Sequence, residues 1–361
     1  MKKNKLLIIT PFPNSGPHQY PHVRYLTDFC EIHYDCDIFI FEERGLEIHK
    51  KLFKINFFKY GLSSVRKNFN FILQFFQLRR LSRKYDNAIS IDNFIFINTV
   101  FAGFKNSYLW SHDFITKDNH LYNRKIYRIL NFLLVYCLKK HPNLIIQDKN
   151  RLNLFKLTYD ITNKLKVFEL PLVLPPVKIE KKIEYKIPQI LQIGGINGGR
   201  SQSDLLVKYF TEKNIDYSLK FHGYIDYKIF EREPRLMNIE ISETFLEPNE
   251  MYHVLQQCQI GVISYNINDL NFFNIRFASN QLVEFLRNGK PVIVLGNSDL
   301  NSFVSENGIG IFINNQREFE KAIIEITENY QTYCIEVINC YNKYFNMENY
   351  SNSLLNYLRN E

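Results

Sequence analysis

The sequence contains no apolar run long enough to cross a membrane, since a spanning helix needs roughly 20 consecutive apolar residues. The nearest run, 129–138 (ILNFLLVYCL), has basic residues on both sides. At the N-terminus MKKNK is positively charged, but the LLIIT that follows is too short for a secretory signal and is interrupted by Pro11 and Pro13. We therefore expect a first strand here and a cytoplasmic protein.

The cysteines show none of the usual cysteine motifs. All six, at positions 30, 36, 137, 258, 334 and 340, stand apart, with no CxxC pair and no Cys/His spacing of a metal site. We interpret them as reduced thiols, which agrees with a cytoplasmic protein.

Acidic residues are missing from one long segment. Residues 48–85 include ten Lys or Arg and no Asp or Glu, interleaved with phenylalanines, in a chain whose formal net charge is +8. Such a segment suits an anionic membrane interface. It can equally be a solvated basic helix whose phenylalanines belong to the core. Nucleic acid is disfavoured as a partner because no recognisable binding module accompanies the charge.

Apolar residues are present in the amount and order that two α/β domains need. The 361 residues are 45% hydrophobic and 15% aromatic, enough to bury two cores. Short strand-like runs alternate with helical stretches at 5–12, 37–42, 87–92, 107–113, 144–148, 189–195, 218–224, 260–265, 290–296 and 310–314. Such runs are typical of parallel strands buried on both faces. The sequence predicts two Rossmann-like domains whose parallel sheets face a ligand cleft at the carboxyl ends of the strands.

A proline-rich, charged segment separates the two halves. Residues 171–188 (PLVLPPVKIEKKIEYKIP) are typical of an extended interdomain connection. We expect a first domain at 1–175, a linker at 176–188 and a second domain at 189–335.

A glycine-rich stretch, GGINGGRS at 194–201, lies between a predicted strand and a predicted helix. It nearly fits the phosphate-binding P-loop, but Arg200 stands where that motif has lysine. A planar guanidinium does not simply replace the flexible lysine, and no strand ending in a magnesium-binding Asp is evident, which disfavours an NTPase. Two interpretations stay open. The glycines let backbone amides approach an anion, with Arg200 adding charge, or the turn is purely structural.

The triplet Asp35-Cys36-Asp37 has the form of a DxD metal site. It leads into the strand-like IFIF, whereas carboxylates that bind metal in this way are expected in a loop after a strand. We interpret Asp35 as the end of a turn and expect no metal site.

The segment SNQLVEFLRNGKPVIV at 279–294 predicts a short helix followed by a strand. Ser279 or Asn280 can cap a helix from Gln281 to Arg287, which Asn288-Gly289 ends. Leu282, Phe285 and Leu286 form its inward face, and Glu284 lies on the flank. A carboxylate there can accept two hydrogen bonds from a ribose diol while the N-terminal amides of the helix face a diphosphate.

This segment resembles the signature of GT-B glycosyltransferases, particularly the nucleotide-sugar-dependent transferases of bacterial surface-glycan synthesis. QILQIGGINGGR, FHGY and FLEPNEMYHVLQQCQIGVISY resemble the elements that precede that signature. TPFPNSG resembles the family's first glycine-containing loop and YLWSHD its strand ending in a histidine. FNMENYSNSLLNYL resembles the final helix, so 336–361 is expected to pack back toward the first domain. The resemblance implies a GT-B fold with an N-terminal acceptor domain and a C-terminal nucleotide-sugar domain.

The resemblance also implies roles for individual residues. Glu284 would hold the nucleotide ribose, Gly223 would lie near the base, and His112 would lie near the transferred sugar. The residues implied around the diphosphate are Gly194, Gly195, Arg200, Ser279, Asn280 and Gln281.

Two positions depart from the family pattern. Many relatives have a second Glu eight positions before the ribose-binding one, where this chain has Arg276, and the common Lys of the signature is Gln281. Arg276 can supply the positive charge that Gln281 lacks and stabilise the departing diphosphate in a metal-free site. The contact to the donor sugar is then open.

Glycosyl transfer needs a positioned acceptor hydroxyl and, in inverting enzymes, a general base. His112 is the best candidate for contacting sugar or acceptor, although it can also be a hydrogen-bonded core histidine. Asp113 beside it can be the functional partner, and His18 and His22 can contact the acceptor. No residue is nominated as the base.

We expect a glycosyltransferase that moves a sugar from a UDP- or GDP-linked donor to a bacterial surface-glycan or lipid-linked acceptor, with no metal or other cofactor. The basic segment would hold it, as a peripheral protein, at the inner face of the cytoplasmic membrane. Two alternatives stay open. One is a sugar-nucleotide epimerase of the same architecture, and the other is a non-catalytic partner subunit, which Arg276 and Gln281 favour.

Overall fold

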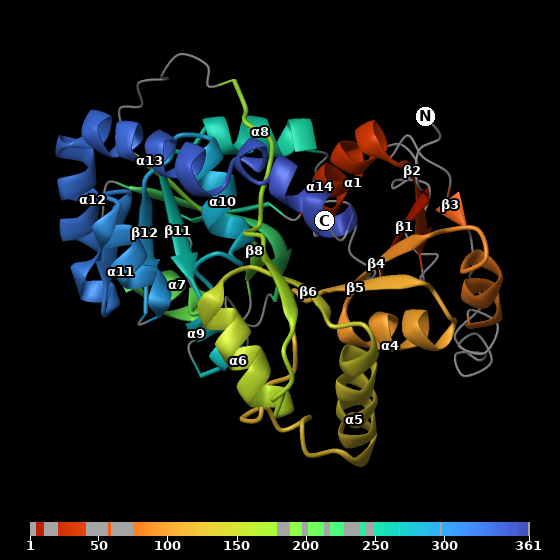
Figure 1. The fold of residues 1–361 in the computed structure, drawn as a ribbon. Coiled ribbons are helices and arrows are strands. Elements are labelled where there is room, and N and C mark those ends of the chain that lie inside the picture. Colours follow the sequence, from red (N-terminus) through yellow and green to blue (C-terminus); the bar gives the residue numbers. More distant parts are fainter. Residues whose placement is uncertain are drawn as a thin grey trace. The chain divides into compact units, whose positions relative to one another are not determined.

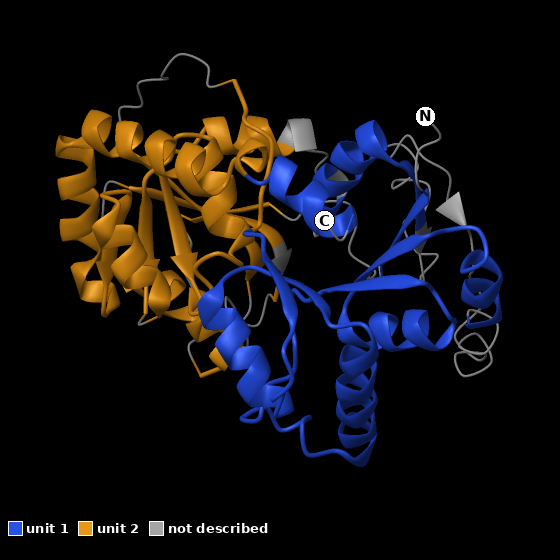
Figure 2. Ribbon diagram, viewed as in Figure 1, with its two compact units in different colours: residues 1–171, 350–361 blue, residues 172–349 orange. Residues whose placement is uncertain are grey.

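The structure is a computed structural model that describes residues 5–10, 21–40, 57–58, 75–178, 188–196, 201–212, 217–226, 239–242, 248–266, 268–296 and 298–359. The chain divides into two compact units (Figure 2). Unit 1 comprises Met1–Pro171 and Tyr350–Glu361, and unit 2 comprises Leu172–Asn349. Some predicted features lie outside the described residues: Arg200, His18, the loop that follows Thr10, and most of the basic segment 48–85.

The strands of unit 1 form one parallel sheet in the order β3-β2-β1-β4-β5-β6-β7 (Figure 1). The strands are β1 (Lys5–Thr10), β2 (Asp35–Ile40), β3 (Phe57–Phe58), β4 (Asn87–Ile91), β5 (Asn106–Trp110), β6 (Asn143–Ile146) and β7 (Lys166–Glu169). Its helices include α1 (Pro21–His33), α4 (Asn93–Phe101), α5 (Lys125–Lys140), α6 (Lys149–Tyr159) and α14 (Ser351–Arg359). Every residue of β4 is buried, as in a parallel sheet covered on both faces.

Unit 2 repeats this plan, with a parallel sheet in the order β10-β9-β8-β11-β12-β13. The strands are β8 (Gln189–Ile196), β9 (Ser218–Ile225), β10 (Ile239–Ser242), β11 (Ile260–Ser264), β12 (Val292–Leu295) and β13 (Gly310–Ile313). The helices include α7 (Ser203–Glu212), α8 (Pro248–Gln256), α9 (Leu270–Phe273), α10 (Asn280–Arg287), α11 (Asp299–Glu306), α12 (Phe319–Glu328) and α13 (Tyr330–Tyr344), with short 3-10 turns η4 (Gln316–Glu318) and η5 (Met347–Asn349).

Strand β12 shows how the core of unit 2 is built. Val292 and Val294 belong to one hydrophobic cluster, and Ile293 and Leu295 belong to another. Successive side chains of a strand point to opposite faces of its sheet, so the sheet has a hydrophobic core on each face. This double burial explains why β12 reads as a continuous apolar run in the sequence.

The predicted α/β fold with parallel sheets is confirmed. Each predicted strand segment overlaps a strand of the structure. The strands that the prediction missed are β3, β7 and β10. β7 and β10 contain no fully buried residue, so they lack the apolar run that marks the others. The interpretation of Asp35 as the end of a turn is wrong, because Asp35 is the first residue of β2 and the triplet lies within that strand.

The unit boundaries differ from the predicted ones. Residues after Pro171 already belong to unit 2, where Leu172 and Leu174 are part of the core and the Tyr341 hydroxyl donates to the Leu174 carbonyl at 2.5 Å. The predicted C-terminal helix, 336–361, is divided: α13 stays in unit 2, and the chain belongs to unit 1 only from Tyr350 onward.

Helix α14 is fixed to the sheet of unit 1 by tyrosine hydroxyl groups. The Tyr108 hydroxyl donates to the Leu358 carbonyl at 2.8 Å, and the Tyr357 hydroxyl donates to the Lys166 carbonyl at 2.9 Å. Because Tyr108 lies in β5 and Lys166 in β7, the final helix completes the core of the first unit.

Candidate functional site

Two glycines lie side by side at the carboxyl ends of neighbouring strands in unit 2. Gly194 of β8 and Gly223 of β9 are register partners with positive φ angles of 98° and 139°. A β-carbon on Gly223 would lie 2.2 Å from the carbonyl oxygen of Gly194, so only glycine fits there. Gly195 follows Gly194 and pairs with Tyr224. This edge of the sheet exposes backbone that a ligand can approach closely.

Helix α10 begins at the same edge, and its N-cap is Ser279, one of the two residues predicted for that position. The Ser279 hydroxyl accepts a hydrogen bond from the Leu282 N–H at 3.0 Å and lies 2.8 Å from the Tyr265 hydroxyl. Ser279 is fully buried. Its hydroxyl therefore fixes the start of the helix, and the positive end of the helix dipole lies beside the glycine pair.

Gln281 joins α10 to the glycine edge. Its side-chain amide nitrogen donates to the Ile193 carbonyl at 2.7 Å and lies 3.2 Å from where a β-carbon of Gly194 would be. Its amide oxygen and that of Asn280 are buried and have no hydrogen-bond partner among the described residues. Buried acceptors usually have a hydrogen-bond partner. These two oxygens can therefore accept hydrogen bonds from donor groups of a ligand.

Glu284 lies one turn into α10 and is only 9% exposed. Its carboxylate oxygen Oε2 accepts a hydrogen bond of 2.7 Å from Nε of Arg287, which is also buried. The helix is thus covered on nearly all sides, with Val283 buried in addition to the predicted inward face. Arg287 fixes the orientation of the carboxylate that is predicted to hold the ribose.

Arg276 lies in the turn before α10. Its guanidinium carbon is 4.8 Å from the ring centre of Phe277 and 5.8 Å from that of Phe303, and its backbone N–H donates to Asp299 Oδ1 at 3.1 Å. Nε of Arg276 is buried with no hydrogen-bond partner in the described part of the chain. The faces of the two aromatic rings therefore hold the guanidinium in place, and its Nε–H is left to donate a hydrogen bond to a ligand.

In unit 1 the predicted residue His112 follows strand β5. Its ring centre lies 4.5 Å from that of Trp110 and 4.4 Å from that of His22 at the start of α1. Burial, together with the nearby His22 and Arg151, holds the pKa of His112 well below its ordinary value. The imidazole is therefore neutral at neutral pH.

A buried arginine and a glutamine hold the segment around His112. Arg151 of α6 donates through Nε to Gln147 Oε1 at 2.9 Å and through Nη2 to the His112 carbonyl. The Gln147 amide nitrogen donates to the Ser111 carbonyl at 2.9 Å and lies 3.4 Å from His112 Nδ1. An amide nitrogen can only donate, so Nδ1 is the acceptor and Nε2 carries the proton. His112 Nε2 is buried without a hydrogen-bond partner among the described residues, which leaves one N–H donor for a ligand.

Asp92 lies at the carboxyl end of the neighbouring strand β4. It has a φ of 93°, unusual for a residue with a side chain, and its Oδ1 caps α4 by accepting from the Phe94 N–H at 2.7 Å. Burial and, to a smaller degree, the charge of Asp113 raise the pKa of Asp92 to about 6. A carboxylate that titrates there can accept a proton near neutral pH.

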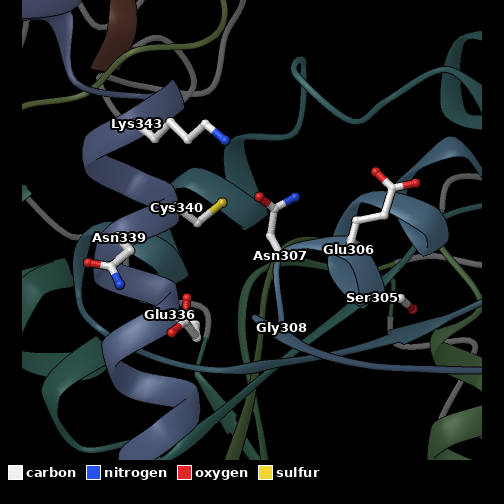
Figure 3. A pocket seen from close by; sticks show the side chains of 8 residues that line it. All are labelled: Ser305, Glu306, Asn307, Gly308, Glu336, Asn339, Cys340 and Lys343. Carbon is white, nitrogen blue, oxygen red and sulfur yellow. The ribbon is translucent and has the colours of Figure 1, made fainter.

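A separate pocket of about 450 Å³ lies in unit 2 (Figure 3). One wall is α13, and the other is the end of α11 with the turn that leads into β13. The lining residues are Ser305, Glu306, Asn307, Gly308, Glu336, Asn339, Cys340 and Lys343. Because this turn precedes β13, the pocket lies at the amino end of the strand. It includes none of the predicted site residues.

The structure brings part of the predicted set together. Gly194, Gly223 and Gln281 meet at one edge of unit 2, and α10 carries Asn280 and Glu284 close to them. His112 belongs to unit 1. Four residues of this region were not predicted from the sequence: Trp110, Gln147 and Arg151, which contact His112, and Asp92 at the end of the neighbouring strand β4. A usable signal existed for two of them, because Asp92 and Gln147 each directly follow a buried strand.

Three solved structures show which proteins share this fold. HepE from Anabaena, solved with UDP-glucose, is 11% identical with a TM-score of 0.73, covering 99% of this chain and 100% of that chain. WaaG, a glycosyltransferase involved in lipopolysaccharide biosynthesis, is 12% identical with a TM-score of 0.67, covering 98% and 99%. A protein described as a UDP-N-acetylglucosamine 2-epimerase from Listeria monocytogenes is 11% identical with a TM-score of 0.61, covering 98% and 95%. The chain therefore has the GT-B fold that the sequence predicts.

The family model matches only part of the chain. Residues 206–356 match the family model for the C-terminal domain of glucosyltransferase 3-like proteins. This range covers most of unit 2, including α10 and its signature segment. No curated protein matches the sequence.

Proposed function

We propose that the protein is a glycosyltransferase that takes a sugar from a UDP- or GDP-linked donor and transfers it, without a metal ion, to a bacterial surface-glycan or lipid-linked acceptor. The observation that carries this proposal is the carboxyl edge of unit 2. There the bare backbone of Gly194 and Gly223 lies beside the start of α10, whose Asn280 and Gln281 hold buried oxygens without partners among the described residues. The solved complex of HepE with UDP-glucose supports a nucleotide-sugar donor.

Each group at this edge has a part in binding the donor. The positive end of the α10 dipole faces the diphosphate. Glu284 accepts hydrogen bonds from the ribose hydroxyls, with Arg287 holding its carboxylate in position. Arg276 adds positive charge that stabilises the leaving diphosphate. Arg200, outside the described residues, is proposed to do the same.

Unit 1 supplies the groups for the acceptor. His112 is neutral and offers its Nε2 proton to an oxygen of the sugar or the acceptor. Asp92, whose pKa is about 6, can take the proton of the acceptor hydroxyl. Both residues lie at the carboxyl ends of neighbouring strands, β5 and β4.

We further propose that the protein works in the cytoplasm at the inner face of the membrane. The support is chemical, because a lipid-linked acceptor is found at a membrane and the sequence has a long basic segment free of acid. The description of WaaG as a lipopolysaccharide enzyme agrees with a surface-glycan acceptor.

Calorimetric titration of the purified protein with UDP, GDP, CMP and ADP tests the proposal. We expect one uridine or guanosine diphosphate to bind with micromolar affinity, equally well in the presence of a metal chelator. Binding that requires a divalent ion contradicts the metal-free site. Failure of every nucleotide to bind at millimolar concentration overturns the proposal and favours a non-catalytic partner subunit.

An epimerase is the second candidate, because the Listeria protein described as an epimerase has the same fold. The two functions differ in what happens to the diphosphate. A transferase releases nucleoside diphosphate when an acceptor is present, whereas an epimerase interconverts nucleotide sugars and the nucleotide is still attached to the product. Chromatography of the reaction products separates these outcomes.

A further inference from the structure

Helix α5 has an exposed apolar face in addition to its buried one. Its inner face packs into unit 1 through Leu134, Cys137 and Leu138. On the outer face, large apolar side chains recur along the helix and are exposed: Ile126 (57%), Ile129 (56%), Phe132 (72%) and Tyr136 (40%). Single exposed apolar residues are common on protein surfaces, but a row of them on one helix needs an explanation.

The neighbouring helix α4 extends this apolar face. Figure 1 shows α4 beside α5, and Phe101, the last residue of α4, is 44% exposed. Its ring stacks on that of Tyr136, with ring centres 6.2 Å apart and an angle of 15° between the planes. We call these five residues the α5 face, namely Phe101, Ile126, Ile129, Phe132 and Tyr136.

The charged side chains of α5 and of the residues that flank it in the sequence are all basic. Residues 119–147 contain no Asp or Glu, and they include Arg124, Lys125, Arg128, Lys139 and Lys140. These residues lie at the two ends of the helix, so the exposed apolar row has cations at both ends. Lys140 also places its Nζ 4.7 Å from the centre of the Tyr136 ring.

We propose that the α5 face is the surface by which this protein lies on an anionic lipid membrane. Apolar side chains enter the boundary between headgroups and acyl chains while lysines and arginines pair with the phosphates, which is how an amphipathic interfacial helix binds. Lys and Arg can reach headgroups with their charged ends while their stems cover apolar surface.

The helix lies on the membrane rather than crossing it. No helix in the described part of the chain is long and apolar enough to span a bilayer. α5 also stays attached to the core through Leu134 and Leu138, so it can present only its outer side. A second copy of the chain is a poor occupant for this face, since it would bring cations against cations.

This inference rests on the proposed function in one respect: membrane binding would bring the acceptor site to a lipid-linked acceptor. Membrane binding itself can be measured apart from any enzyme activity. Sedimentation of the full-length protein with vesicles tests it, using vesicles of pure phosphatidylcholine and vesicles that also contain phosphatidylglycerol. We expect binding to the anionic vesicles, weakened by high salt, and little binding to the neutral ones.

Two variants test the face. In the double variant Ile129→Asp with Phe132→Asp, vesicle binding should fall at least tenfold, while Leu157→Asp on α6, where the side chain is 70% exposed, should bind as the wild type does. In the double variant Lys139→Gln with Lys140→Gln, affinity for anionic vesicles should fall about fivefold for each lysine. Circular dichroism checks that each variant is folded.

Four results would overturn the inference. The first is wild-type vesicle binding in the Ile129→Asp, Phe132→Asp variant, and the second is an equal loss in Leu157→Asp. The third is a wild-type dimer that this double variant converts to a monomer. A further variant, Phe132→Trp, should show a blue shift of fluorescence with anionic vesicles, and an unchanged spectrum also contradicts the inference. Nucleotide titration distinguishes the two proposals. If the double variant binds nucleotide normally but no longer binds vesicles, the α5 face is supported. If the protein binds vesicles but no nucleotide, only the proposed function is refuted.

Discussion

Arg287 donates a hydrogen bond of 2.7 Å to the carboxylate of Glu284, and both side chains are nearly buried. The two residues are three positions apart on α10, so the helix itself sets their spacing. A carboxylate held in this way is already oriented before a ribose arrives, which reduces the entropy lost on binding. The same contact means that Glu284 contributes both to stability and to the proposed donor site.

Replacing Glu284 with alanine should reduce both properties. It leaves a buried guanidinium without its partner, which should lower the free energy of unfolding by about 3 kcal/mol. It should also weaken nucleotide binding about tenfold or more, because two hydrogen bonds to the ribose are lost. Denaturant unfolding and calorimetry measure the two effects.

Arg287→Ala is the matched control. It breaks the same ion pair and should cost similar stability, yet it leaves the carboxylate for the ribose. Nucleotide affinity should then fall less than in Glu284→Ala, because the carboxylate is still present but is no longer held in position. If both variants lose affinity to the same degree, the ribose role of Glu284 is wrong.

Replacing Gly223 with alanine should destabilise unit 2 strongly. The new β-carbon would lie 2.2 Å from the Gly194 carbonyl oxygen at a φ of 139°, so the two strand ends would have to separate. We expect a loss of about 3 kcal/mol or more in the free energy of unfolding. Gly103→Ala is the control, since Gly103 has a φ of 85° and no atom within 4 Å of an added β-carbon. Its cost should be about 1–2 kcal/mol, and equal losses would contradict the close approach of β8 and β9.

Asp92→Asn should change the dependence of stability on pH. The pKa of Asp92 is raised from 3.8 to about 6 in the folded protein, so folding favours the protonated carboxyl group. The wild type therefore loses stability as the pH rises from about 4 to about 6, and this loss is complete above that window. The asparagine variant keeps the cap on α4 without the charge. Its stability relative to the wild type should therefore show no gain near pH 4 and a gain of about 3 kcal/mol at pH 7.

Thermal melts of both proteins across this pH range measure the difference. The activity should move in the opposite direction, because asparagine cannot accept the proton of an acceptor hydroxyl. A stability difference that does not vary with pH would show that Asp92 does not titrate in this window.

The imidazole of His112 should stay neutral when the solution is mildly acidic. Burial and two nearby basic side chains lower its pKa, so an NMR titration should find its ring signal unchanged at a pH where free histidine is half protonated. His112→Gln identifies the signal by its loss. A normal titration curve would contradict the buried environment and the role of Nε2 as a donor.

The fold could be predicted because buried strands leave a recognisable pattern of apolar residues in the sequence. Strands covered on both faces, such as β4 and β12, appear as short continuous apolar runs. The start of α10 was also visible, since Ser279 caps the helix with a local hydrogen bond. β7 and β10 were missed because partial exposure removes that pattern.

The candidate site was harder to predict from the sequence because its features depend on tertiary contacts. The raised pKa of Asp92 and the buried acceptor on Gln281 depend on burial, which the local sequence does not reveal. The α5 face shows the same limit. Its sequence is apolar on two sides, and only packing decides which side is covered by the core and which is exposed.

The hydrogen bonds that join helix α14 to the sheet of unit 1 through Tyr108 and Tyr357 have a consequence for biosynthesis. Helix α14 belongs to unit 1 but is translated after all of unit 2. On the ribosome, therefore, the unit that is begun first is finished last, whereas unit 2 is one continuous segment with every residue it needs. A nascent chain released before residue 350 would contain a complete unit 2 and an incomplete unit 1, whose apolar contacts with α14 would be exposed to chaperones and proteases.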